Sequence, residues 1–154
     1  MTCDMRLGRV LGLPAILGEH QIGHVERAVL SRNGHHLMGL MIRRGLGSAK
    51  WVDHRAIGVL GDVSVILSDK PCRPPKDCDF TLHTVKDESG LTLGWVTDAW
   101  ISPETLDVTA LEISLGYLED LRRGRLIVRD WAVQPGDHEG AQVLIPREEW
   151  EVKA

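Results

Sequence analysis

The sequence predicts an all-β protein made of two small β-barrels in tandem, related by internal duplication. Three observations support this fold class: one stretch of the chain repeats, the apolar residues of each copy alternate as in strands, and a proline-rich segment separates the copies. Short strands without long helical patterns favour closed or half-closed barrels, because closure removes sheet edges that would otherwise pair with other chains.

The repeat joins "QIGHVERAVLSRNGHHLMGLMIRRG" (residues 21–45) to "TLGWVTDAWISPETLDVTALEISLG" (residues 92–116). The two stretches align without a gap at a shift of 71 residues, which places Gly23 on Gly94. The second copy then inserts seven residues within "YLEDLRRGR", and the alignment resumes at a shift of 78. Self-similarity at a constant shift indicates two copies of one structural unit.

Within each copy the pattern predicts a β-hairpin with further strands on either side. The apolar runs before and after "SRNGHH" and "SPETLD" alternate as strands do, and the residues between them are typical of turns. An earlier strand is predicted in "RVLGLPAIL" of the first copy and in "TLHTVKDE" of the second. Two later strands are predicted in each copy, namely "KWVDHRAIGVLG" and "VSVIL" in the first, and "GRLIVRDWAV" and "AQVLIP" in the second.

The segment "SDKPCRPPKDCD" between the copies contains three prolines and six charged residues, which exclude a helix interior or a central strand. We therefore expect a first barrel at residues 5–69, a linker at residues 70–79 and a second barrel at residues 80–150.

Composition and charge limit the classes of function. The chain of 154 residues has a net charge of −4, divided into +3 for residues 1–70 and −7 for residues 81–154. An acidic chain argues against nonspecific nucleic-acid binding, although the first half alone would attract phosphate. No apolar run is long enough to cross a bilayer, and three cysteines are too few for a disulfide framework, so we expect a cytoplasmic protein without membrane insertion.

Beginning at "LGLPAILGEHQIGHVERAVLS", the first copy resembles the PRC-barrel family, the small β-barrel of the photosynthetic reaction-centre H subunit and of a ribosome-maturation protein. The matching elements are "IGHV" (residues 22–25), the hairpin and the closing "IGVLGDVSVIL" (residues 57–67). The second copy keeps "LGWV" (residues 93–96) and the hairpin, but "QPGDHEG" is longer than the corresponding turn. The resemblance implies an assembly or interaction module and no catalysis.

No group of residues in the sequence forms a convincing reactive or metal site. Cys72, Cys78 and His83 lack the close pairs and the fourth ligand that structural zinc needs, so we expect linker cysteines, with a metal or redox role as the alternative. Asp53 and His54 are neighbours in a predicted strand and should point to opposite faces. No nucleophile elbow or complete phosphate-binding loop is present, and "GLGSAK" is interpreted as a strand connection.

Tryptophans and arginines supply the candidate partner-binding residues, which are Trp95, Trp100, Arg43 and Arg44. The five tryptophans hold most of the aromatic area, and they either fill the barrels and the seam between them or anchor a partner. The basic clusters "RRGLGSAK" and "LRRGRLIVR" lack interleaved aromatic residues, which favours solvated strand ends over an RNA surface.

These observations predict a non-enzymatic adaptor or assembly module that binds another protein and needs no cofactor or metal. The alternative is an RNA- or ribosome-associated maturation factor, and homo-oligomerisation is left open.

Overall fold

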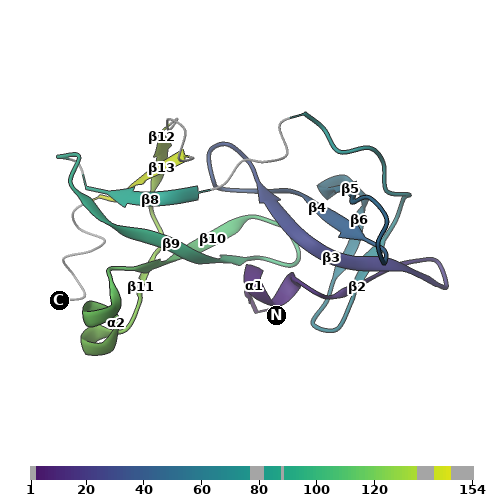
Figure 1. The fold of residues 1–154 in the computed structure, drawn as a ribbon, viewed down its shortest axis with the longest axis horizontal. Helices are drawn as coiled ribbons and strands as arrows, with labels where there is room; N and C mark the ends of the chain where they lie inside the picture. Colours follow the sequence, from purple (N-terminus) through teal and green to yellow (C-terminus); the bar gives the residue numbers. More distant parts are fainter. Residues whose placement is uncertain (1–2, 77–81, 88, 135–140, 147–154) are drawn as a thin grey trace.

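The computed structural model describes residues 3–76, 82–87, 89–134 and 141–146 of the chain. The protein is mostly β and contains two sheets, one of which curls as a half-barrel. The two sheets lie side by side along the long axis of the molecule (Figure 1), and each is formed almost entirely by one of the two sequence repeats.

Both sheets have the same strand order. The first sheet follows the order β5-β4-β3-β2-β7-β6, and the second follows β11-β10-β9-β8-β13-β12. The strands of the first sheet are β2 (Pro14–Leu17), β3 (His20–Leu30), β4 (Leu37–Arg43), β5 (Lys50–Asp53), β6 (Ile57–Leu60) and β7 (Val65–Leu67). Those of the second are β8 (Leu82–Lys86), β9 (Thr92–Ile101), β10 (Val108–Ser114), β11 (Leu126–Val128), β12 (Ala132–Gln134) and β13 (Ala141–Leu144).

The sequence shift of 71 residues also relates the hairpins of the two sheets. Leu40 of β4 is fully buried and faces Ala28 of β3, while Leu111 of β10 is fully buried and faces Ala99 of β9. The two leucines therefore occupy equivalent core positions, as the alignment predicts. Among the described residues, no strand pairing joins the two ends of either sheet, so neither sheet is closed into a complete barrel by hydrogen bonds.

The glycine shared by "IGHV" and "LGWV" is explained by a close approach between neighbouring strands. A Cβ atom at Gly23 would lie 2.7 Å from the backbone oxygen of Arg43, and Gly23 has a φ of 154°. A Cβ atom at Gly94 would clash with the backbone oxygen of Ser114, which is the residue equivalent to Arg43. Each hairpin thus needs a residue without a side chain where its two strands come together.

Turn residues set the first hairpin. The carboxamide oxygen of Asn33 accepts hydrogen bonds from the Ser31 hydroxyl at 2.6 Å and from the His35 backbone N–H at 2.9 Å. Gly34 then adopts a φ of 74°, which glycine tolerates without steric cost. The predicted turn is confirmed, and it places His35 and His36 at the end of the hairpin.

The two hairpin turns meet between the sheets through reciprocal hydrogen bonds. The Leu37 N–H donates to the Leu106 oxygen, and the Val108 N–H donates to the His35 oxygen, both at 2.9 Å. The shift of 71 residues exchanges these two bonds, since Leu37 corresponds to Val108 and His35 to Leu106. Such an exchange is the pattern of a contact across an approximate twofold axis.

The first residues of the chain cross to the opposite sheet. Strand β1 (Met5–Arg6) pairs with the end of β9, where Met5 faces Ile101, and it leads into the short helix α1 (Leu7–Val10) at the middle of the molecule (Figure 1). The expected first unit at residues 5–69 therefore contributes its first strand to the second sheet. Part of the strand expected in "RVLGLPAIL" is helical, and the strand begins only at Pro14 after the turn at Gly12.

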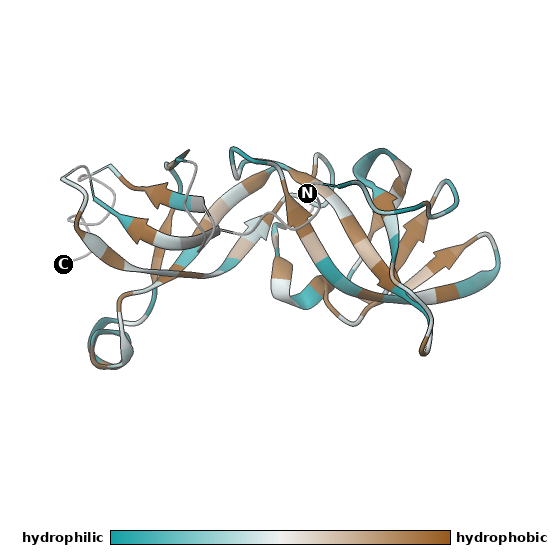
Figure 2. Cartoon of the chain, turned by 45° about the horizontal axis from the view of Figure 1, so that its top comes forward, coloured by the Kyte–Doolittle hydropathy of each residue, from teal (hydrophilic) through white to brown (hydrophobic). Residues whose placement is uncertain are grey.

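The buried apolar residues of both sheets belong to one continuous core cluster, which includes Val10, Ile101 and Trp131 near the seam. Figure 2 shows the hydrophobic residues spread along the strands of both halves. A separate small cluster of Val29, Met41 and Trp51 lies on the other face of the first sheet. The halves are thus packed against each other through apolar side chains, as the repeat in a short chain predicts.

The predicted strands "KWVDHRAIGVLG" and "GRLIVRDWAV" each form two strands rather than one, whereas "VSVIL" and "AQVLIP" each form one, as predicted. In the first copy, the 3₁₀ turn η1 (His54–Ala56) separates β5 from β6. In the second copy, the residues between Val128 and Ala132 separate β11 from β12. Both breaks allow the chain to leave one edge of its sheet and return at the other edge.

Candidate functional site

The outward face of β9 and β10 carries helix α2 (Tyr117–Arg123), which projects away from the first sheet (Figure 1). This helix lies within "YLEDLRRGR", the segment in which the second repeat has its insertion. Gly116 precedes it with a φ of 113°, and Gly124 ends it with a φ of 75°. Glycines at both ends allow the chain to turn out of the sheet and back within a short segment.

Asp120 fixes the helix to the sheet. Its carboxylate accepts hydrogen bonds from the Ser114 hydroxyl at 2.6 Å and from the Leu115 N–H at 3.2 Å. Its backbone oxygen accepts a bond from the Gly124 N–H at 2.9 Å. The orientation of α2 is therefore set by one acidic residue on the side of the helix that faces the sheet.

Helix α2 presents three large apolar side chains to solvent. Tyr117, Leu118 and Leu121 are exposed by 78%, 73% and 68%, respectively. Their spacing places all three on one side of the helix. On the strands beside α2, Trp95 is 48% exposed and faces Ser114, the residue that binds Asp120.

We name the docking face as the set Trp95, Tyr117, Leu118 and Leu121. Clusters of exposed large apolar residues are unusual on monomeric proteins and mark interaction sites. Tyrosine and tryptophan also offer large contact areas at little cost in conformational entropy.

Arginines border the docking face. Arg122 and Arg123 share Glu119, each at 3.6 Å, so that two cations meet one carboxylate. Arg125 binds Glu112 at 2.9 Å and approaches Asp120 at 3.7 Å. The rim of the docking face therefore includes three partly exposed guanidinium groups, and two of these share one carboxylate at 3.6 Å among the residues that the structure describes.

Glu112 is a buried charge beneath this region, with a residue exposure of 3%. It accepts hydrogen bonds from Arg125 at 2.9 Å and from Thr97 at 3.0 Å, and Arg6 forms an ion pair with it at 2.7 Å. Burial raises the pKa of Glu112, but the hydrogen bonds from Arg125 and Thr97 and the charges of both arginines outweigh it and hold the pKa below 4.5. Because Arg6 belongs to the crossing N-terminal strand, this carboxylate links that strand to the second sheet.

The structure separates the four predicted partner-binding residues. Trp95 belongs to the docking face, whereas Arg43 and Arg44 lie at the end of β4 in the other sheet. Trp100 is half-buried, and the guanidinium carbon of Arg6 lies 4.7 Å from the centroid of its ring. The Trp100 ring is thus partly covered by the protein itself and is a weaker candidate for an anchor than Trp95.

The other tryptophans differ in their surroundings. Trp51 and Trp131 are buried, and the Trp131 ring stacks on His35 at a centroid distance of 4.5 Å. This contact lies across the seam and agrees with the interpretation of tryptophan as core and seam filler. Trp150 lies outside the described residues.

Histidines gather where the halves meet. His36 Nδ1 lies 2.9 Å from the Asp107 carboxylate, and the His36 ring packs edge-on against His54 at 5.1 Å. His54 Nδ1 also lies 3.2 Å from the Asp53 carboxylate. The expectation that Asp53 and His54 point apart is wrong, because the chain leaves the strand at Asp53 and enters η1.

These histidines do not form a metal site. Among the described residues, no group of three or more histidine, cysteine or acidic side chains is placed to hold a metal ion. Cys72 is exposed, and its backbone pairs with Trp51 of β5, so that the start of the linker runs along this edge of the first sheet. Cys78 and the side chain of His83 lie outside the described part, and their role stays a prediction.

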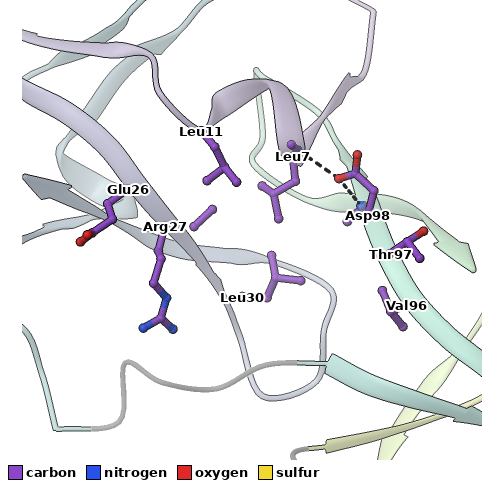
Figure 3. Close-up of a pocket in the computed structure, with 11 residues that line it drawn as sticks. Leu7, Leu11, Glu26, Arg27, Leu30, Val96, Thr97 and Asp98 are labelled. Atoms are coloured by element: carbon purple, nitrogen blue, oxygen red, sulfur yellow. Dashed lines mark hydrogen bonds between the residues drawn. The ribbon is translucent and has the colours of Figure 1, made fainter.

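A hollow of about 320 Å³ lies at the seam between α1, β3 and β9 (Figure 3). Leu7, Leu30 and Val96 contribute apolar walls, and the Asp98 carboxylate accepts a hydrogen bond from the Gly8 N–H at 3.0 Å. This hollow lies near the middle of the molecule, whereas α2 lies at the far end of the second sheet (Figure 1).

Comparison of the sequence with models of known protein families and with curated proteins gave no match. In the described part of the chain, no helix is both long enough and apolar enough to span a membrane.

The sequence prediction missed α2 and Glu112 as parts of the site. The insertion itself was visible, and tyrosine and leucine at helical spacing within "YLEDLRRGR" could have indicated an exposed apolar side. No sequence signal identified Glu112 as buried, because its partner Arg6 is more than one hundred residues away in the chain.

Proposed function

We propose that this protein is a tandem PRC-barrel adaptor without catalytic activity, which binds a partner protein through the docking face. The observation that supports this function most directly is the exposure of Tyr117, Leu118 and Leu121 on a helix that Asp120 holds rigidly in place. The repeated six-strand order supports the assignment of two related barrel-type units.

The charges around the docking face specify the partner. Arg122, Arg123 and Arg125 lie beside the apolar residues, so the partner presents an apolar surface bordered by carboxylates. Carboxylates that approach Arg122 and Arg123 would compete with Glu119 at 3.6 Å, which is a weak, solvent-exposed interaction.

Replacement of Leu118 or Leu121 with glutamate is expected to weaken binding of the partner at least about tenfold, because it places a charge in the apolar contact and repels an acidic rim. The partner is first captured from native lysate with the tagged full chain, then purified and titrated against each variant. Leu46→Glu is the matched control, since Leu46 is fully exposed in a loop of the first sheet.

The proposal requires that the purified partner bind the native chain and the Leu46→Glu variant equally well and the α2 variants poorly. If the α2 variants bind as tightly as the native chain, the docking face has been assigned wrongly. If nuclease treatment abolishes capture, the RNA- or ribosome-associated function replaces the adaptor function.

A further inference from the structure

The end of the first sheet contains a second, chemically distinct hollow of about 490 Å³, which we name the basic pocket. Three aliphatic side chains line it, namely Leu17, Ile22 and Ile42, together with three cationic ones, namely Arg44, Lys50 and Lys70. Gly47, Ser48 and Pro71 complete the lining. The basic pocket therefore combines an apolar wall with a group of positive charges.

The loop that carries Arg44 and leads to Lys50, the first residue of β5, is held in place by Arg43. The Arg43 guanidinium donates to the Gly47 backbone oxygen at 2.6 Å and to the Glu26 carboxylate at 2.8 Å. The Gly47 N–H in turn donates to the Arg44 oxygen at 3.1 Å, with Gly45 at a φ of 57°. The loop between β4 and β5 is thus shaped before any ligand arrives, which lowers the entropic cost of binding.

The positive charges of the basic pocket are not balanced by its own lining. None of the described residues that line it is acidic. The nearest acidic residue along the chain, Asp69, accepts a hydrogen bond from the Lys70 backbone N–H at 2.8 Å, and Glu26 is occupied by Arg43. Three cations around one hollow repel one another, and an anion would relieve that repulsion.

In the second repeat, leucines occupy the positions equivalent to Arg44 and Lys50, and the corresponding end of the sheet is closed. Arg44 corresponds to Leu115 at the shift of 71, and Lys50, which faces Ile42, corresponds to Leu126, which faces Ile113. Leu126 is buried and Leu115 packs against the core. One repeat thus seals this end with leucines, while the other opens it and surrounds it with cations.

We propose that the basic pocket binds a small amphipathic anion, in which a carboxylate or phosphate group is attached to an apolar body. The apolar body packs against Leu17, Ile22 and Ile42, which lose contact with water. The anionic group accepts hydrogen bonds from Arg44, Lys50 and Lys70, and such charge-assisted bonds are stronger than neutral ones. This site is independent of the docking face, which lies on the other sheet.

Hexyl phosphate is a suitable probe, and hexanol and inorganic phosphate, which each carry one half of it, are the comparison ligands. Calorimetric titration of the full chain is expected to show binding of hexyl phosphate that is at least about tenfold tighter than binding of either half, because only the complete probe uses both the apolar wall and the cations. The dissociation constant should increase with added sodium chloride, since salt screens the contribution of the three cations.

The test variants replace a cation of the basic pocket with leucine, the residue at the equivalent position of the second repeat. Lys50→Leu and Arg44→Leu are each expected to weaken hexyl phosphate binding about tenfold, with the fold retained because the second repeat holds leucine at both positions. The control is Arg55→Leu, which removes one positive charge from a side chain that is 83% exposed and belongs to neither proposed site. Circular dichroism of every variant verifies that the fold is intact.

Vesicles that contain phosphatidic acid test whether the bound anionic group belongs to a membrane lipid or to a free small molecule. Cosedimentation that is lost in Lys50→Leu assigns the anion to a lipid headgroup, whereas binding of hexyl phosphate without cosedimentation assigns it to a free small molecule. The proposal is overturned if neither probe binds at millimolar concentration, if hexyl phosphate and inorganic phosphate bind equally, or if the leucine variants bind as the control does.

Discussion

Replacement of Gly94 with alanine is expected to destabilise the protein by about 3 kcal/mol, because the added Cβ atom meets the backbone oxygen of Ser114 in the neighbouring strand. The clash involves main chain on both sides, so a change of rotamer cannot relieve it. The hairpin would have to separate at the position where it supports Trp95. Urea denaturation monitored by tryptophan fluorescence measures the loss.

Gly23→Ala is the matched variant in the first repeat. It should destabilise the protein by a similar amount, about 3 kcal/mol, because the Cβ atom would approach the Arg43 oxygen and the φ of 154° disfavours a side chain. Thr92→Ala is the control in an exposed position of β9, with an expected change within about 0.5 kcal/mol. Glycine variants as stable as this control would contradict the close strand approach.

Replacement of Glu112 with alanine is expected to cost about 3 kcal/mol, since it removes the common partner of Arg6, Thr97 and Arg125 from a buried position. The crossing N-terminal strand should loosen at the same time, because Arg6 loses its closest ion pair. Chemical denaturation gives the energy, and the rate of proteolysis near residue 6 reports the loosened strand. Glu119→Ala, at a partly exposed glutamate with ion pairs of 3.6 Å, is the control and should change stability little.

The effect of Glu112 depends on pH in a defined direction. Its pKa is lower in the folded protein than the usual 4.5, so its contribution is complete above the unfolded-state pKa and is lost as the pH falls through the folded-state value. The difference in stability between the native chain and Glu112→Ala should therefore decrease below about pH 4.5. A difference that stays constant down to pH 3 would show that the carboxylate charge does not stabilise the fold.

The sequence predicted the hairpins and their relation well, because both depend on short-range signals. Alternating apolar residues define the strand faces, and Asn33 and Gly34 define a turn. The shift of 71 residues then relates Leu40 to Leu111 in the core as it does in the alignment. These features are encoded within about thirty residues of chain and need no knowledge of distant contacts.

Contacts between distant residues were beyond such reasoning. Nothing in "MR" at residues 5–6 indicates that it pairs with β9 rather than with its own sheet. The ion pair of Arg6 with Glu112, the contact of Asp53 with His54 and the course of the linker past Trp51 all depend on how segments pack in three dimensions. The incomplete closure of the sheets likewise depends on strand geometry that apolar alternation does not specify.

The candidate sites arise from differences between the repeats rather than from what they share. The positions of Arg44 and Lys50 hold leucines in the second copy, and α2 has no counterpart in the first. Comparing the repeats position by position in the sequence could have identified the insertion that forms α2 and the exchange of Arg44 for Leu115, whereas the match of Lys50 with Leu126 follows only from the strand pairing. Their meaning required the structure, which shows that one set lines a hollow and the other is exposed on a helix.

The two repeats should behave as one folded unit, because the reciprocal bonds of the hairpin turns and the crossing strand β1 join them. Native-state hydrogen exchange measured by NMR tests this directly at the amides of Leu40 in β4 and Leu111 in β10. The two amides should show the same free energy of opening and the same dependence on urea, as expected for a single cooperative transition. If Leu111 exchanges through an opening of the second sheet that leaves Leu40 protected, the repeats are independent domains and the seam does not hold them together.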